Sequence, residues 1–220
     1  LKKMTKEAKI LISVGLIIFI GIVILGVSQP KQVAPSLPVS ENTLIREGSH
    51  MTGEKTAKVT IVEFGDYQCP ACASAHPLVK KVLADYADNK DVNFVFRNFP
   101  LPMHKNADVS SEAAEAAAAQ GKFWEMHDMI YEKQSEWAEA NNAIDIFVSY
   151  AETLGLDTGV FKSDVQAKKY SLIIAADKKD GNDAEVTGTP TFFINGKKIG
   201  TGVPSYEDFK KEIDAALAIK

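Results

Sequence analysis

"VTIVEFGDYQCPAC", residues 59–72, joins an apolar run to the only two cysteines of the chain. The run at residues 58–64 is short and rich in β-branched side chains, which predicts a buried strand. A helix is expected from residue 73 to about residue 88, and residues 92–97 form a second predicted strand. Strand, helix and strand in this order predict a βαβ unit, with the cysteine pair where the first strand meets the helix.

The surroundings of Cys69 and Cys72 separate four interpretations of the pair. A structural zinc site needs four ligands, but there is no second cysteine pair, and the histidines at 50, 76, 104 and 127 have no typical spacing. Haem attachment needs a histidine where Ala73 stands. A purely structural bridge over so short a loop would stabilise little. A C-x-x-C motif within a βαβ pattern therefore indicates a redox-active disulfide, with no metal and no other cofactor expected.

The start of the predicted helix gives the two sulfur atoms different environments and different expected roles. Pro70 suits the first helical turn, which leaves Cys69 at or near the N-cap, where free N–H groups and the helix dipole lower the pKa of a thiol. Cys72 lies one turn further in and should be shielded. We expect Cys69 to be attacked by substrates and Cys72 to resolve or regenerate the disulfide. Asp66, Tyr67 and His76 are weaker candidates for the surface or rim of the site, without a chemical step.

The rest of the chain predicts helices followed by a hairpin and a last helix. Residues 106–179 are rich in Ala, Glu and Lys, with apolar side chains three and four apart. Asn195-Gly196 is a strong two-residue hairpin signal between apolar runs. Ser205 followed by Asp208 is a variant of the capping box and predicts the start of a C-terminal helix.

Composition and charge limit the partners. A chain of 220 residues with 45% hydrophobic side chains can form one sizeable core. The formal charge is −4, and four lysines in residues 1–27 leave 21 basic and 28 acidic residues after them. An acidic domain of this kind does not indicate a nucleic-acid partner.

The N-terminal region predicts a membrane anchor and a linker. Residues 10–27 carry no charge, and as a helix they would extend about 27 Å, enough to cross a bilayer. A cleaved signal peptide is less favoured because the run is long and no A-x-A-like site follows it. The lysines should stay in the cytoplasm, which sends the remainder to the outer face of the membrane. Residues 28–55, with three prolines and no apolar period, are expected to form an extended linker.

Three stretches together resemble the DsbA-like thiol:disulfide oxidoreductases of the thioredoxin superfamily: "VTIVEFGDYQCPAC", "QGKFWEMHD" and "VTGTPTFFING". The resemblance covers about residues 52–220. It implies an α/β thioredoxin fold over residues 56–220, with a helical insertion at about 106–180. The resemblance excludes the linker and the single transmembrane helix, which are predicted separately from residues 1–55. Cys69 would be the nucleophilic sulfur that faces the substrate.

The resemblance also assigns supporting residues. It implies a cis Thr189–Pro190 bond, although an ordinary proline at a strand start is the alternative. Glu63 matches the buried acidic residue of the family, which can move protons to and from the resolving thiol, although a solvent-facing strand residue is the alternative. Ala71 departs from the Pro-His dipeptide of the best-known members, which puts a strongly oxidising potential in doubt.

These inferences predict a membrane-tethered, extracytoplasmic oxidoreductase that donates the Cys69–Cys72 disulfide to exported proteins with free thiols. The alternatives are a tethered reductase that serves a dedicated partner, and a peptide-binding or holdase module that does not use its cysteines. The expected partners are exported proteins and a quinone-linked membrane reoxidase, and the protein is expected to be a monomer.

Overall fold

The computed structural model describes residues 39–219. The predicted anchor at residues 10–27 and the first part of the predicted linker lie outside the described residues. Within residues 39–219, no helix has both the length and the apolar composition needed to cross a membrane.

A five-stranded sheet forms the centre of the fold, in the order β1-β3-β2-β4-β5. The strands are β1 (His50–Thr52), β2 (Val59–Gly65), β3 (Val92–Asn98), β4 (Thr191–Ile194) and β5 (Lys197–Thr201). β2 and β3 are parallel, as a βαβ unit requires, and the other neighbours are antiparallel. All seven residues of β2 are buried because this strand is central and both sheet faces are covered.

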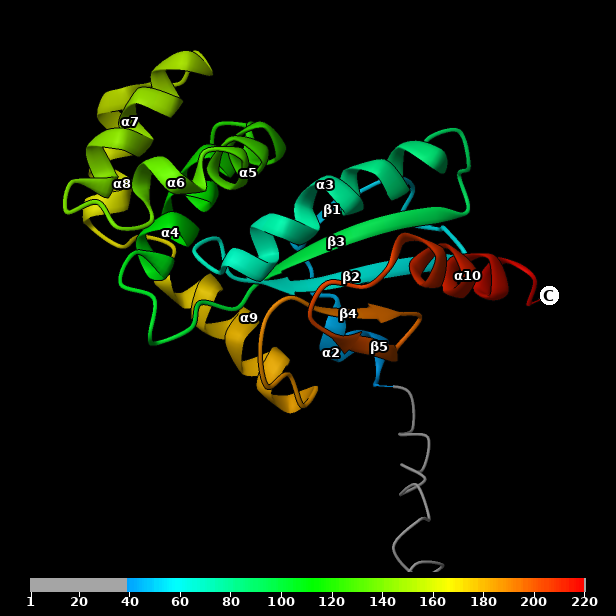
Figure 1. The fold of residues 1–220 in the computed structure, drawn as a ribbon. Coiled ribbons are helices and arrows are strands. Elements are labelled where there is room, and N and C mark those ends of the chain that lie inside the picture. The colour runs from blue at the N-terminus through cyan, green and yellow to red at the C-terminus, as the bar shows by residue number, and fades with distance from the viewer. Residues whose placement is uncertain (1–38, 220) are drawn as a thin grey trace, which may run out of the picture. The chain divides into compact units, whose positions relative to one another are not determined.

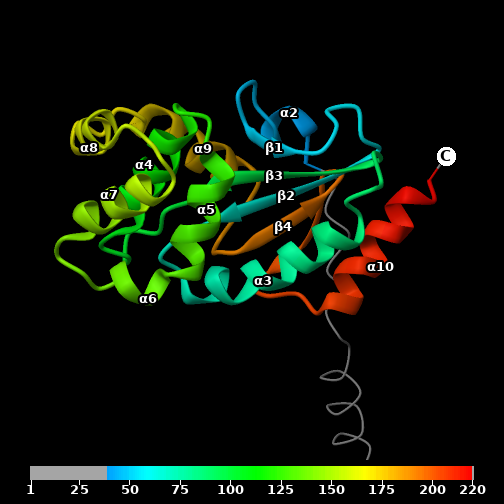
Figure 2. The ribbon, with the colours of Figure 1, turned by 90° about the horizontal axis from the view of Figure 1, so that it is seen from above.

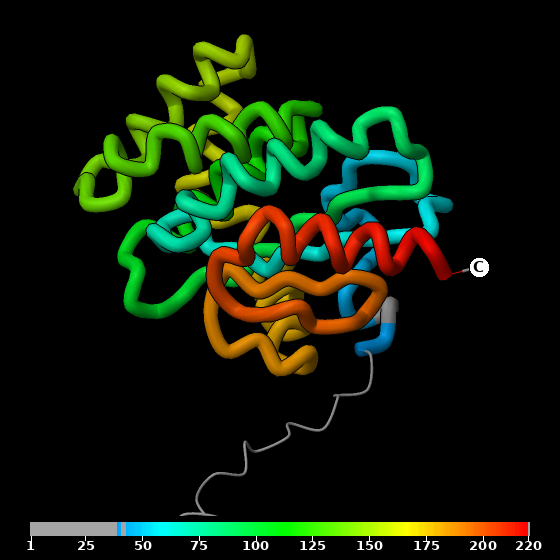
Figure 3. Tube along the Cα trace, turned by 45° about the vertical axis from the view of Figure 1, so that its right-hand side comes forward, coloured from blue at the N-terminus to red at the C-terminus, as the bar shows by residue number. Residues whose placement is uncertain are grey.

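The two faces of the sheet are covered by different helices (Figures 1 and 2). On one face lie α3 (Pro70–Asp85) and α10 (Tyr206–Leu217), over a core that includes Ile61, Phe96 and Phe192. On the other face lie α2 (Glu41–Leu44) and α9 (Ser171–Asp183), near a smaller core that includes Phe64 and Phe193. Figure 3 shows α10 in red beside the orange β4–β5 hairpin. The alternation of side chains along the strands thus fills two cores.

The helical insertion runs from α4 to α9 and gathers at the end of the sheet toward which β2 runs (Figure 2). Before α9 it contains α4 (Ala107–Ala118), α5 (Phe123–Glu132), α6 (Gln134–Trp137), α7 (Ala143–Thr153) and α8 (Thr158–Gln166). Its aromatic residues, such as Trp137, Phe147 and Phe161, belong to the same core as the α3 face of the sheet. The insertion and the βαβ unit therefore stabilise one another through shared burial.

Local signals placed the later elements correctly. Asn195 and Gly196 have φ angles of 47° and 80°, the left-handed conformations that a tight Asn-Gly hairpin turn requires. Ser205 caps α10 by accepting a hydrogen bond from the N–H of Asp208. Helix α3 begins at Pro70 with Cys69 as its N-cap, as the helix-start signal of Pro70 predicted, whereas the apolar pattern alone placed the start at residue 73.

The prediction of an extended linker up to residue 55 is wrong for the described part of that segment. Residues 41–44 form α2, residues 50–52 form β1, and His50 pairs with Phe96 at the sheet edge. Leu44 is only 1% exposed, in the smaller core. Local sequence did not reveal this order because the contacts that create it come from distant residues.

One such contact is made by Arg97, which is fully buried on β3. Its guanidinium donates to the Leu44 carbonyl at 2.5 Å, to Asp177 at 2.8 Å and to Asp180 at 2.6 Å. Arg46 pairs with Asp180 as well. These hydrogen bonds join Leu44 and Arg46 to the sheet and to α9, and they leave the buried guanidinium of Arg97 well paired.

Candidate active site

The cysteine pair lies where the end of β2 turns into α3. The N–H of Cys69 donates to the carbonyl of Asp66 at 3.0 Å, and this turn brings Cys69 to the N-cap with φ −67° and ψ 122°. Both cysteines are free thiols. Cys69 is 7% exposed and Cys72 is fully buried. Cys69 is the more exposed of the two cysteines, as predicted. It is nevertheless more deeply buried than its position at the start of the helix suggested.

The two thiols have opposite pKa shifts. A hydrogen bond from Cys72, followed by the side chain of Thr189 and the N–H groups of Cys72 and Ala71, lowers the pKa of Cys69 to about 5. Burial, and then the hydrogen bond to Cys69 and the charge of Glu63, raise the pKa of Cys72 well above its usual value. At neutral pH the reduced pair therefore consists of a thiolate at Cys69 and a thiol at Cys72.

Glu63 lies on the α3 side of β2, two residues after Ile61, and is only 3% exposed. The structure therefore rules out the solvent-facing alternative. Burial, with a smaller contribution from the charge of Cys69, raises the pKa of Glu63 to about 8. A carboxyl group with such a pKa can both give and take a proton near neutral pH, as its predicted role requires.

The Thr189–Pro190 segment covers the cysteine pair from the other side. The bond between these residues is cis, as the resemblance implied. The Cys69 thiol lies 3.4 Å from the Thr189 carbonyl oxygen, and the Pro190 carbonyl accepts a hydrogen bond from the N–H of Gly202 at 2.7 Å. The structure therefore brings together, from opposite ends of the domain, the residues that the sequence assigned to one site.

The expectation that Asp66 and Tyr67 shape the surface of the site is wrong, because both are buried. The Asp66 carboxylate accepts hydrogen bonds from the N–H of Gln68 at 2.7 Å and of Leu101 at 2.9 Å, and lies 2.6 Å from His104 Nδ1. Asp66 thus connects the turn before Cys69 to the loop that follows β3.

His76 is also buried rather than at a rim. It lies beside His127 of α5, whose Nδ1 is 2.9 Å from the Tyr67 hydroxyl. His76, His127 and Asp128 each place one possible ligand atom within 4.8 Å of the others. Sequence reasoning missed this cluster because its members come from two helices about 50 residues apart.

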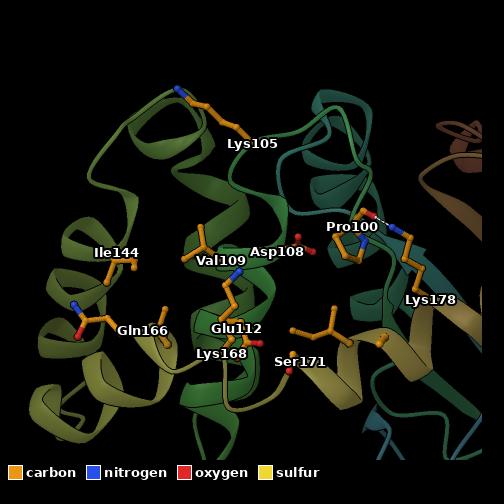
Figure 4. Close-up of a pocket in the computed structure, with 13 residues that line it drawn as sticks. Pro100, Lys105, Asp108, Val109, Glu112, Ile144, Gln166, Lys168, Ser171 and Lys178 are labelled. Carbon is orange, nitrogen blue, oxygen red and sulfur yellow. Dashed lines mark hydrogen bonds between the residues drawn. The ribbon is translucent and has the colours of Figure 1, made fainter.

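A cavity of about 450 Å³ opens among the helices of the insertion (Figure 4). Its walls come from the loop after β3 and from α4, α7, α8 and α9. The labelled lining residues include Pro100, Val109, Glu112, Ile144 and Lys178. None of the predicted site residues lines it, so the cavity is separate from the cysteine pair.

Comparisons with curated proteins give two kinds of relative. The chain is 40% identical over 150 residues to a Na(+)/H(+) antiporter NhaA 1 of Salinispora arenicola, but the match covers 68% of this chain and only 22% of that protein. This chain spans about a fifth of the length of such relatives. It is 28% identical over 213 residues, 94% of each chain, to the "Probable disulfide bond formation protein D" of Bacillus cereus.

Solved structures and a family model agree with the fold. The crystal structure of oxidised BdbD from Bacillus subtilis has a TM-score of 0.73 and 25% identity, covering 83% of this chain and 99% of that one. Wolbachia pipientis alpha-DsbA2, a thiol-disulfide exchange protein, has a TM-score of 0.68 at 18% identity, covering 79% and 90%, which supports the fold alone. Residues 46–215 match the family model described as Thioredoxin. The chain therefore belongs to the thioredoxin family, as a DsbA-like member.

Proposed function

We propose that this protein is a thiol–disulfide oxidoreductase that donates the Cys69–Cys72 disulfide to proteins exported from the cell. The observation that carries the proposal is the opposite pKa shift of two thiols held at one helix start. The name of the Bacillus cereus relative, a probable disulfide bond formation protein, supports the same chemistry.

The proposed reaction begins with the oxidised pair. A substrate thiolate attacks Cys69 Sγ, the Cys69–Cys72 bond breaks, and Cys72 leaves as a thiolate that takes up a proton. Glu63, with a pKa of about 8, is the group proposed to supply that proton. A second substrate thiolate then attacks the substrate sulfur of the mixed disulfide, and Cys69 leaves as a stable thiolate. The substrate loses two electrons and the enzyme gains two.

The pKa of Cys69 favours donation over the reductase alternative. A low thiolate pKa stabilises the reduced protein and so makes its disulfide more oxidising. The value of about 5 lies between the roughly 7 of thioredoxin and the roughly 3.5 of DsbA. Ala71 supplies no imidazole between the cysteines, and the lowering comes first from the hydrogen bond of Cys72. We therefore propose a moderately oxidising pair.

The proposed location follows from residues 10–27 and the lysines before them, which the structure does not describe. An N-terminal anchor with the catalytic domain outside would place the cysteines where disulfides persist. A quinone-linked membrane protein is the proposed acceptor of electrons from the reduced pair, and the protein is proposed to act as a monomer.

The test is the equilibrium of the Cys69–Cys72 pair with glutathione, combined with oxidation of a reduced peptide that carries two thiols. The proposal predicts stoichiometric peptide oxidation by the oxidised protein and none by Cys69→Ser. A pair as reducing as thioredoxin would favour the reductase. Peptide binding that survives loss of both cysteines, without any peptide oxidation by the wild type, would favour the holdase.

A further inference from the structure

His76, His127 and Asp128 form a cluster of donors outside the cysteine pair that the proposed function does not use. His76 belongs to α3, one turn after Cys72, and the other two residues belong to α5. One ligand atom of each residue lies within 4.8 Å of the other two. Two imidazoles and one carboxylate are a donor set that suits divalent transition metals.

The His76 imidazole supplies the second observation. Its side chain is 5% exposed, and its Nε2 atom is buried without a hydrogen-bond partner. The nearest carboxylate oxygen, Asp128 Oδ1, lies 3.4 Å away. A buried nitrogen left without a partner costs free energy, and a metal ion between Nε2 and Oδ1 would satisfy both atoms.

The outer atoms of the other two donors already have partners. The Nδ1 atom of His127 contacts the Tyr67 hydroxyl at 2.9 Å, which leaves the opposite ring nitrogen available. Lys80 donates to Asp128 Oδ2 at 2.8 Å, which leaves Oδ1 on the His76 side. Partners of this kind fix the orientation of metal ligands in known sites.

From this arrangement we infer that His76, His127 and Asp128 bind one divalent transition metal ion, with Zn²⁺ as the best match to the donor set. Three protein ligands leave a further position for water. The ion would join α3, which carries the cysteines, to α5 of the insertion, two helices that already contact one another. Lys80 keeps its bond to Asp128 Oδ2 and its bond to Glu132 at 2.9 Å.

The test must exclude the cysteines, because thiolates bind Zn²⁺ themselves. Metal-free full-length protein with Cys69→Ser and Cys72→Ser is titrated with Co²⁺, whose visible absorption reports its ligands, and bound Co²⁺ is then displaced with Zn²⁺. The inference predicts one ion per chain, bands of a nitrogen and oxygen site, and full displacement by Zn²⁺.

Variants identify the ligands. His76→Gln and Asp128→Asn, each in the cysteine-free protein, should weaken binding at least about tenfold. The Asp128 side chain is 36% exposed, so Asp128→Asn should not unfold the protein. Asp145→Asn is the matched control, since Asp145 is an exposed aspartate that pairs with Lys162 as Asp128 pairs with Lys80. No stoichiometric binding, or binding that both variants leave unchanged, would overturn the inference, whatever the redox activity proves to be.

Discussion

The Sγ atom of Cys69 lies 3.4 Å from the carbonyl oxygen of Thr189, although 120 residues separate the two in the chain. This contact brings the start of α3 against the segment that enters β4. The side chain of Thr189, rather than its carbonyl, contributes to the low pKa of Cys69, after the larger contribution of Cys72. The site therefore depends on the return of the chain from the helical insertion to the sheet.

The contribution of Cys69 to the stability of the reduced protein should increase as the pH rises from 5 to about 8.5. Its folded pKa of about 5 lies below the roughly 8.5 of an unfolded thiol, so its contribution is complete above the unfolded value and is lost as the pH falls through 5. The slope is at most about 1.4 kcal/mol per pH unit. Urea unfolding of reduced Glu63→Gln protein, compared with reduced protein that carries Cys69→Ser as well, isolates this slope from other titrating groups. Identical profiles for the two proteins would contradict the lowered pKa.

Glu63 should lower the stability of the folded protein as the pH rises, which is opposite to the effect of Cys69. Its folded pKa of about 8 lies above its unfolded value of 4.5, so the protein loses stability as the pH rises between these values. In oxidised wild-type protein, where no thiol titrates, burial still raises the pKa of Glu63, so stability should fall with rising pH relative to oxidised Glu63→Gln. The stability of the wild type minus that of the variant should therefore decrease as the pH rises. Parallel pH profiles for the two proteins would contradict the raised pKa of Glu63.

Glu63→Gln should also slow peptide oxidation by about tenfold or more at pH 7, because the glutamine cannot transfer a proton. The rate should lose its inflection near pH 8, while the circular dichroism stays unchanged. Glu125→Gln is the control, since Glu125 is an exposed glutamate of α5. Identical pH–rate profiles for wild type and Glu63→Gln would remove Glu63 from the mechanism.

Leu44→Ala should lower the free energy of unfolding by about 2–5 kcal/mol, because it removes a buried side chain from the smaller core. Leu172→Ala provides the same substitution at a leucine that is 84% exposed, and should change stability by less than about 0.5 kcal/mol. Urea denaturation of both variants compares them directly. Equal stabilities would mean that the segment before β1 does not belong to the folded domain.

Asp66→Asn should destabilise the protein by about 1–3 kcal/mol, since an amide cannot accept all the hydrogen bonds that the buried carboxylate receives. It should also raise the pKa of Cys69, because the turn that positions this residue becomes less constrained. Asp88→Asn, at an exposed position, is the control. Thiolate absorbance measured against pH distinguishes the variants, and an unchanged Cys69 pKa would limit Asp66 to a structural role.

The sequence was informative where a feature depends on neighbouring residues. The βαβ unit, the N-cap position of Cys69, the Asn195-Gly196 turn and the Ser205 cap all follow from local patterns, and all are present. The family resemblance supplied the cis bond at Pro190.

Features that depend on distant contacts were missed. The order of residues 41–52 depends on burial of Leu44 and on Arg97, and neither contact leaves a periodic pattern in the sequence. Asp66 and His76 are polar residues that local rules place at the surface, but their partners come from the loop after β3 and from α5. Such residues can be assigned only when the packing of the insertion is known.

The central claim is that Cys69 reacts with substrates and Cys72 resolves, and disulfide trapping tests it most directly. Cells that express either Cys72→Ser or Cys69→Ser are quenched with acid, and the mixed disulfides are resolved without reductant. The account predicts complexes linked through Cys69 in Cys72→Ser, because the remaining thiolate has a pKa of about 5 and the resolving thiol is gone. Cys69→Ser should yield none. Trapped substrates in Cys69→Ser and none in Cys72→Ser would contradict the account.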